Sequence, residues 1–137
     1  MKAARNCVKT WGGDKNRIQT VIAHSVSGWD VPGMAYHIMY DLDLPVDTRA
    51  IPVVMAGCHA GLTVTSAGKA YVESEGGLAL VCTGDEFSSQ TRFYGNNNEI
   101  NRSLQIPGLL FGDGFAAMLL GRPTKEDIER TYTIYAC

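Results

Sequence analysis

Residues 50–61 read AIPVVMAGCHAG, an apolar run of strand-forming residues that leads into Cys58 between two glycines. A helical pattern follows from about Leu62, which predicts a sharp corner between a strand and a helix. Glycine suits such a corner because the backbone there turns tightly or approaches a ligand closely. A thiol at a helix start faces unpaired N–H groups and the positive end of the helix dipole, which favour the thiolate. Cys58 is therefore a candidate nucleophile, and the alternative is a buried structural cysteine.

The segments on either side of this corner alternate between helical and strand patterns. The run 50–56 is almost continuously apolar, as expected of a strand buried on both faces of a parallel sheet. Helices are expected at 4–11, at 34–42 and from about 62, and strands at 18–23, 50–56, 78–82, 115–120 and 131–135. Alternation of this kind predicts a layered α/β fold around a mostly parallel, mixed central sheet.

Two connecting segments carry separate expectations. Residues 87–106 are polar and weakly periodic, so we expect a long loop, and long loops in compact domains are often functional. The turn at 112–114 is expected to join two strands, with Asp113 serving the turn and not a metal. No internal repeat or domain linker interrupts residues 1–137, which indicates a single domain.

The amino-acid composition limits which binding partners and which cellular compartment are expected. The chain has 137 residues, of which 45% are hydrophobic and 19% charged, with a formal net charge of -2. This balance gives no electrostatic footprint for nucleic acid or an anionic membrane. The four cysteines are too widely spaced to indicate a disulfide framework or a zinc site. The chain has no signal-peptide core and no apolar run that could span a bilayer, so a cytoplasmic, soluble protein is expected.

Four ordered motifs carry a family resemblance. They are SGWDVPG at 27–33, GCHAG at 57–61, Glu86, and LFGDGFAA at 110–117. Together they resemble the chalcone and stilbene synthases, which are type III polyketide synthases of the thiolase superfamily. The resemblance spans nearly the whole chain and corresponds to the N-terminal half of that fold. It implies a single partial domain over 1–137, incomplete relative to the full two-half fold.

The resemblance implies an acyltransferase whose nucleophile is Cys58. In the family, the matching cysteine accepts an acyl group from acyl-CoA and then undergoes condensation with decarboxylating malonyl-CoA. CoA thioesters are thus the implied substrates, and no cofactor or metal is implied as permanently bound. Ser27 matches a residue of the initiation cavity, and Ser88 and Thr91 match residues that shape the elongation pocket. Phe111 matches an aromatic gatekeeper between the CoA tunnel and the reaction chamber, and simple core packing is its alternative.

Other positions carry weaker implications. Glu86 matches an inward acidic position with a structural role, and Val31 stands where family members often reach into the partner subunit, which implies a homodimer. His59 replaces the usual phenylalanine, so substrate choice is not carried over. As a neighbour of Cys58 at a helix start, His59 is expected to point away from the thiol and not to act as its general base. His24 and His37 are expected to be ordinary strand-end and helix-surface residues.

No segment matches the catalytic histidine and asparagine that the family contributes from its second half. The resemblance therefore leaves open whether this chain alone is an enzyme, since these residues activate the cysteine and stabilise the enolate. One alternative is another condensing enzyme of the fold, such as a ketoacyl synthase III or a hydroxymethylglutaryl-CoA synthase. Another is a truncated, non-catalytic thiolase-fold protein that binds a partner or acyl-CoA. A complementing thiolase-fold half is the expected partner if the homodimer is not.

Overall fold

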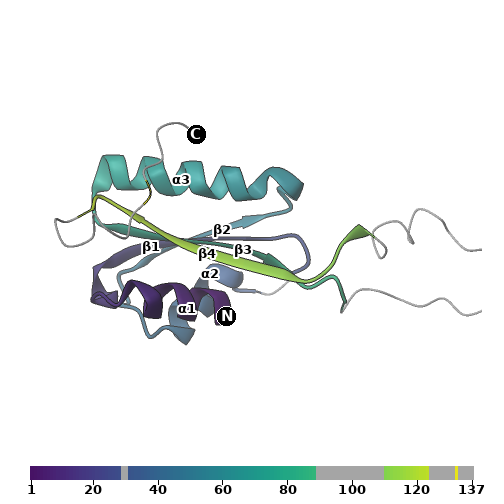
Figure 1. Ribbon diagram of the computed structural model, residues 1–137, viewed down its shortest axis with the longest axis horizontal. Coiled ribbons are helices and arrows are strands. Elements are labelled where there is room, and N and C mark those ends of the chain that lie inside the picture. The colour runs from purple at the N-terminus through teal and green to yellow at the C-terminus, as the bar shows by residue number, and fades with distance from the viewer. Residues whose placement is uncertain (29–30, 89–109, 124–131, 133–137) are drawn as a thin grey trace, which may run out of the picture.

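The computed structural model describes residues 1–28, 31–88, 110–123 and 132. Within these ranges, four strands form one mixed sheet with helices on both of its faces (Figure 1). The strands are β1 (Ile18–Ser25), β2 (Arg49–Val54), β3 (Leu78–Asp85) and β4 (Gly114–Gly121). The helices are α1 (Lys2–Trp11), α2 (Met34–Asp41) and α3 (Ala60–Glu75), with short 3-10 turns η1 (Lys15–Arg17) and η2 (Gly57–His59). The predicted layered α/β fold is confirmed.

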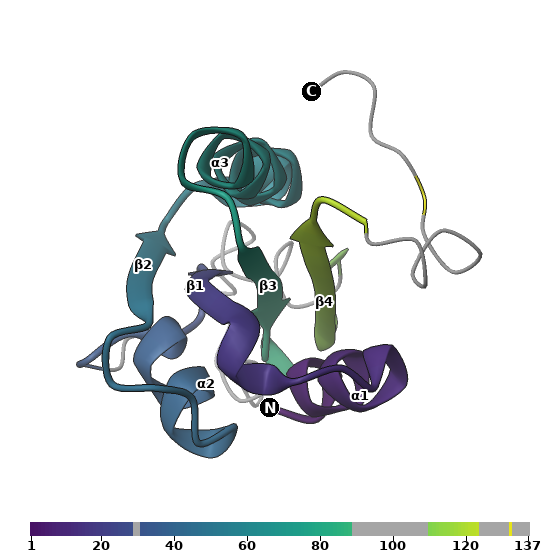
Figure 2. The ribbon, with the colours of Figure 1, turned by 90° about the vertical axis from the view of Figure 1, so that its left-hand side faces the viewer.

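The strand order is β2-β1-β3-β4, in which β1 runs parallel to β2 and β3 while β4 runs antiparallel to β3. Helix α2 connects β1 to β2, and α3 connects β2 to β3 across β1. Figure 2 shows α1 and α2 below the sheet and α3 above it. Because three strands are parallel, their carboxyl ends share one edge, on the right in Figure 1. There Gly114, the first residue of β4, pairs with Asp85, the last of β3.

Two apolar clusters hold these layers together. On the face covered by α1 and α2, buried residues such as Val21 and Leu80 of the sheet pack with Ile38. On the opposite face, Ile22 of β1 packs with Val64 of α3. The alternation along β1 is what a strand covered on both faces requires, since successive side chains point to opposite sides. The central strands β1 and β3 therefore bury the apolar residues that predicted them, together with one face of each helix.

Two glycines set local geometry in the helices. Helix α1 ends at Gly12, which has a φ of 73° and donates its N–H to the Val8 carbonyl at 3.0 Å. This left-handed cap ends the helix after Trp11, in agreement with the predicted helix at 4–11. In α3, a Cβ on Gly68 would lie 2.6 Å from Val81 Cγ2, so this helix approaches the sheet too closely for a side chain there. Glycine at position 68 thus permits the close helix-to-sheet contact.

Two expectations about the sheet are wrong. In the sheet that the described residues form, β2 is an edge strand and is not buried on both faces, since Pro52 is exposed and Val54 is 63% exposed. An edge tolerates proline because the missing N–H faces away from the neighbouring strand. The turn at 112–114 does not join two strands either: Phe111 is outside any strand, and β4 pairs with β3. The predicted strand at 131–135, apart from Tyr132, and most of the predicted loop at 87–106 lie outside the described residues.

Candidate active site at the carboxyl edge of the sheet

The cysteine corner is the segment 55–59 between β2 and α3. Met55 and Gly57 both have left-handed backbones, with φ of 56° and 70°, and η2 carries Cys58 directly into α3. A left-handed residue other than glycine costs about 1–2 kcal/mol and persists where its surroundings hold it, often at a functional site. Cys58 is exposed, so the alternative of a buried structural cysteine is wrong. The predicted corner is confirmed, with the helix beginning at Ala60.

A buried histidine reaches this corner from the sheet. His24, near the end of β1, is 1% exposed, and its Nε2 accepts the Ala56 N–H at 3.3 Å. Its Nδ1 lies 3.4 Å from the Thr83 hydroxyl oxygen on β3. A backbone N–H can only donate, so Nε2 carries no proton and the neutral ring donates Nδ1–H to Thr83. His24 thus lies at the strand end, as predicted, and is buried and hydrogen-bonded there, while His37 is exposed on α2, also as predicted.

The electrostatic surroundings of His24 favour this neutral form. Burial lowers the pKa of His24 below its usual value, nearby Asp85 raises it, and His59 lowers it further, with a net decrease. The sequence signal for this role is a histidine near the end of an otherwise apolar strand. That signal is weak because the hydrogen-bond partner, Ala56, lies in the loop after β2, far from His24 in the sequence.

Asp85 fixes the loop that follows β1. Its Oδ1 accepts hydrogen bonds from the backbone N–H of Val26 at 2.6 Å and of Ser27 at 2.7 Å. The hydroxyls of Ser25 and Ser27 donate to the same oxygen at 3.0 and 2.9 Å. Burial raises the pKa of Asp85, but these hydrogen bonds outweigh it and the pKa lies below the usual value. The carboxylate therefore ties the end of β1 to the end of β3.

This arrangement corrects the expectation for Glu86. The acidic side chain that serves the sheet edge is Asp85, while Glu86 is exposed and its N–H donates to the Ser27 hydroxyl at 2.8 Å. Asp85 and Glu86 are adjacent in sequence, and side chains of successive residues along a strand point in opposite directions. The Ser27 hydroxyl, expected in an initiation cavity, thus bridges Asp85 and the Glu86 backbone.

A third contact joins the end of β3 to the segment before β4. The N–H and hydroxyl of Ser88 donate to the two carboxylate oxygens of Asp113 at 2.8 and 2.5 Å. These hydrogen bonds lower the pKa of Asp113, and the one from the Ser88 hydroxyl has the largest effect. Beside them the rings of Phe87 and Phe111 stack with centroids 5.1 Å apart. Phe111 is 38% exposed, so it is not simply packed in the core.

The described candidate residues thus share one edge of the sheet. Ser27 follows β1, Cys58 follows β2, Ser88 follows β3, and Phe111 precedes β4. The carboxyl edge of parallel strands is where α/β proteins commonly bind ligands. Thr91, the remaining candidate, lies outside the described residues.

The other described cysteines differ from Cys58. Cys7 on α1 is half-buried, and burial raises its pKa. Cys82 in β3 is buried, and its burial, with a smaller effect of Cys7, raises its pKa to about 12. Such thiols stay protonated near neutral pH. Of the described cysteines, Cys58 is therefore the one suited to nucleophilic attack.

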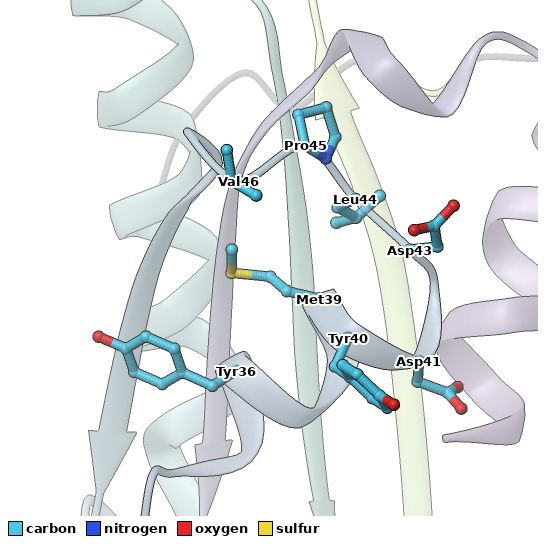
Figure 3. A pocket seen from close by; sticks show the side chains of 8 residues that line it. All are labelled: Tyr36, Met39, Tyr40, Asp41, Asp43, Leu44, Pro45 and Val46. Atoms are coloured by element: carbon cyan, nitrogen blue, oxygen red, sulfur yellow. The ribbon is translucent and has the colours of Figure 1, made fainter.

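A hollow of about 650 Å³ lies away from these residues (Figure 3). It is formed by α2 and by the loop that leads from it to β2, with Tyr36 and Tyr40 on one side and Leu44 to Val46 on the other. Tyr40 and Val46 are exposed there, and none of the candidate site residues lines the hollow. Its position gives it no part in chemistry at Cys58.

The described part of the chain lacks two features. Among those residues, no group of three or more His, Cys, Asp or Glu side chains could bind a metal ion. No helix formed by them is long and apolar enough to cross a bilayer.

A mixed sheet flanked by helices, with a cysteine at a strand-to-helix corner, defines an α/β protein with a candidate site at its carboxyl edge. The family profile of chalcone and stilbene synthases, N-terminal domain, matches residues 1–123. The chain therefore belongs to this family of type III polyketide synthases in the thiolase superfamily, and the match is to the N-terminal half of the family's fold. The family resemblance expected from the four motifs is confirmed.

Proposed function

We propose that this chain provides the nucleophile of a type III polyketide synthase reaction. The Cys58 sulfur attacks the carbonyl carbon of an acyl-CoA, and the bond from that carbon to the CoA sulfur breaks. CoA leaves as a thiol after taking up the proton that Cys58 gives up, and the acyl group stays on Cys58 as a thioester. A thioester suits this role because it is stable enough to hold and reactive toward carbon nucleophiles.

The condensation step follows from the same intermediate. Malonyl-CoA loses CO₂, and the resulting carbanion attacks the Cys58 thioester, forming a carbon–carbon bond and releasing the thiolate. The observation that carries the proposal is the exposed Cys58 on a left-handed corner, in a chain whose family uses a cysteine there. Ser27, Ser88, Thr91 and Phe111 are proposed to border the acyl chain. The starter acyl group and the number of extensions are not part of the proposal.

The proposal includes a second contributor to the site. By resemblance, the family supplies a histidine and an asparagine from the C-terminal half of its fold, and the profile match here is to the N-terminal half. Without such groups, stabilisation of the developing charge would fall by roughly 3–4 kcal/mol or more. We therefore expect slow acylation by this chain alone and faster acylation once the second half is supplied.

Intact mass spectrometry tests the proposal directly. The chain is incubated with acetyl-CoA or hexanoyl-CoA, with and without a separately produced C-terminal half of a family member. We expect a mass increase of one acyl group that Cys58→Ser abolishes and Cys82→Ala leaves unchanged. Failure to detect an adduct under both conditions would contradict acyl transfer and favour a non-catalytic thiolase-fold protein.

We further propose that the chain associates with a second copy or with a complementing half. Val31, at the position where the family implies a partner contact, is 96% exposed. Sedimentation velocity of the chain, alone and mixed with the second half, tests this. We expect a complex in at least one condition that Val31→Asp weakens, and a monomer in both would contradict the association.

A further inference from the structure

The corner that presents Cys58 is hydrogen-bonded to the sheet through the side chain of His24. Ala56 lies between Met55 and Gly57, whose backbones are both left-handed, and its N–H is donated to His24 Nε2 at 3.3 Å. The ring comes from the centre of the sheet, because His24 pairs with Val53 of β2 on one side and Thr83 of β3 on the other. A contact from so rigid an element can hold an unfavourable backbone in place.

The ring can perform this role in only one protonation state. Nε2 must be unprotonated to accept the Ala56 N–H, and Nδ1 must then carry the proton that is donated to Thr83. Protonation of His24 would place a hydrogen on Nε2, facing the Ala56 N–H, and would break that hydrogen bond. The hydrogen bond therefore depends on pH as well as on the presence of the ring.

The groups around His24 define how it titrates. From β3, the carboxylate of Asp85 favours the protonated ring, and from η2, His59 disfavours it. Thr83 is a neutral partner on β3, and burial favours the neutral ring more strongly than Asp85 opposes it. Above the usual pKa of histidine the ring is neutral and the hydrogen bond is present.

We propose that neutral His24 is a positioning residue for Cys58: by accepting the Ala56 N–H, it holds the corner in the conformation that exposes the thiol. The inference concerns the cysteine of the proposed function, but it is a statement about the corner and holds for any reaction of that thiol. Loss of the acceptor would free Met55 and Gly57 to leave their left-handed conformations. Cys58 would then spend less time in its exposed position.

Two variants separate the acceptor from the bulk of the ring. His24→Phe keeps a ring but has no acceptor, whereas the side-chain carbonyl of His24→Gln can reach the position of Nε2. We expect exchange of the Ala56 amide hydrogen to rise roughly tenfold in His24→Phe and to stay within about threefold of the wild type in His24→Gln. Alkylation of Cys58 by iodoacetamide, in a Cys137→Ser background, is expected to fall about threefold in the Phe variant only.

Two further measurements separate positioning from mere packing. Nitrogen-15 NMR of His24 in the full chain is expected to show an unprotonated Nε2 and a protonated Nδ1 at pH 7.5. The ratio of wild-type to His24→Gln alkylation rates is expected to fall as pH decreases through the pKa of His24, because glutamine does not titrate. If His24→Phe does not fold, these two measurements still decide the question.

Three results would overturn the proposal. One is the opposite tautomer, and another is a wild-type to Gln rate ratio that does not change as pH falls through the His24 pKa measured in the same NMR titration. The third is a folded His24→Phe variant with wild-type exchange and alkylation. None of these measurements uses acyl-CoA, so a missing acyl adduct with an intact corner would contradict the proposed function alone.

Discussion

The cysteine corner and the interior of the sheet place their thiols in opposite environments, one exposed to solvent and the other buried. Cys58 is exposed on a corner with two left-handed residues, whereas Cys82 is buried in β3 among apolar side chains. Burial raises the pKa of Cys82 to about 12 and keeps it a small apolar residue. The comparison teaches that position in the fold, and not residue type, separates a candidate nucleophile from a core residue.

The two regions also differ in what stabilises them. The interior depends on apolar contacts between the sheet and its helices. The carboxyl edge depends on hydrogen bonds from loops to His24, Asp85 and Asp113. Two of these residues are carboxylates and one is a histidine, so the geometry of the edge should depend on pH while the interior should not.

The largest expected difference is in thiol reactivity. We expect iodoacetamide at pH 8 to modify Cys58 at least about 100-fold faster than Cys82, because the latter is buried and protonated. Peptide mapping over a time course measures both rates. Cys58→Ser should remove the fast phase and Cys82→Ala should retain it. Comparable rates at the two positions would eliminate the contrast between corner and interior.

The next largest effect is expected at Asp85. Replacement by alanine removes the acceptor of four hydrogen bonds, and we expect a loss of about 2–3 kcal/mol in the free energy of unfolding. Asp85→Asn keeps an acceptor oxygen without its charge, so its loss should be smaller. Urea unfolding at pH 7 measures both variants, and an unchanged Asp85→Ala would contradict the role of the carboxylate.

The same pair of proteins tests the pH dependence of the edge. The pKa of Asp85 is lower in the folded chain than its usual 3.8, so the ionised form is stabilised by folding. Its contribution is present above that usual value and is lost as pH falls through the folded pKa. The advantage of wild type over Asp85→Asn should therefore decrease below about pH 4. An advantage that persists in acid would indicate a contribution other than charge.

The smallest effect is expected when a methyl group is added to the corner by substituting Gly57 with alanine. No atom lies within 4 Å of a Cβ built on Gly57, but its φ of 70° is unfavourable for alanine. Gly57→Ala should therefore lose about 1–2 kcal/mol of unfolding free energy through its backbone alone. Gly61→Ala is the matched control, since the space at position 61 is also empty and Gly61 lies in a helix, where alanine is favoured. Equal stabilities for the two variants would mean that the corner is not held in its left-handed form.

Several parts of the fold could be predicted because their signals are local. The end of α1 at Trp11, the strand before Cys58 and the helix after it depend on neighbouring residues and on apolar spacing. The four motifs likewise identified the family from short stretches in a fixed order. The burial of β2 was predicted wrongly because apolar content alone does not separate an edge strand from a central one; Pro52 was the local signal of an edge.

The amino-acid sequence by itself determined the helices and strands, the glycine-flanked corner and the family, since backbone propensities and apolar periodicity act over a few residues. Only the tertiary structure decided that β2 lies at the edge of the described sheet, that Asp85 accepts the hydrogen bonds of the loop after β1, and that His24 reaches the corner. The His24 contact to Ala56 spans 32 residues. Such contacts depend on strand order and register, because a shift of one residue turns a side chain to the opposite face of the sheet.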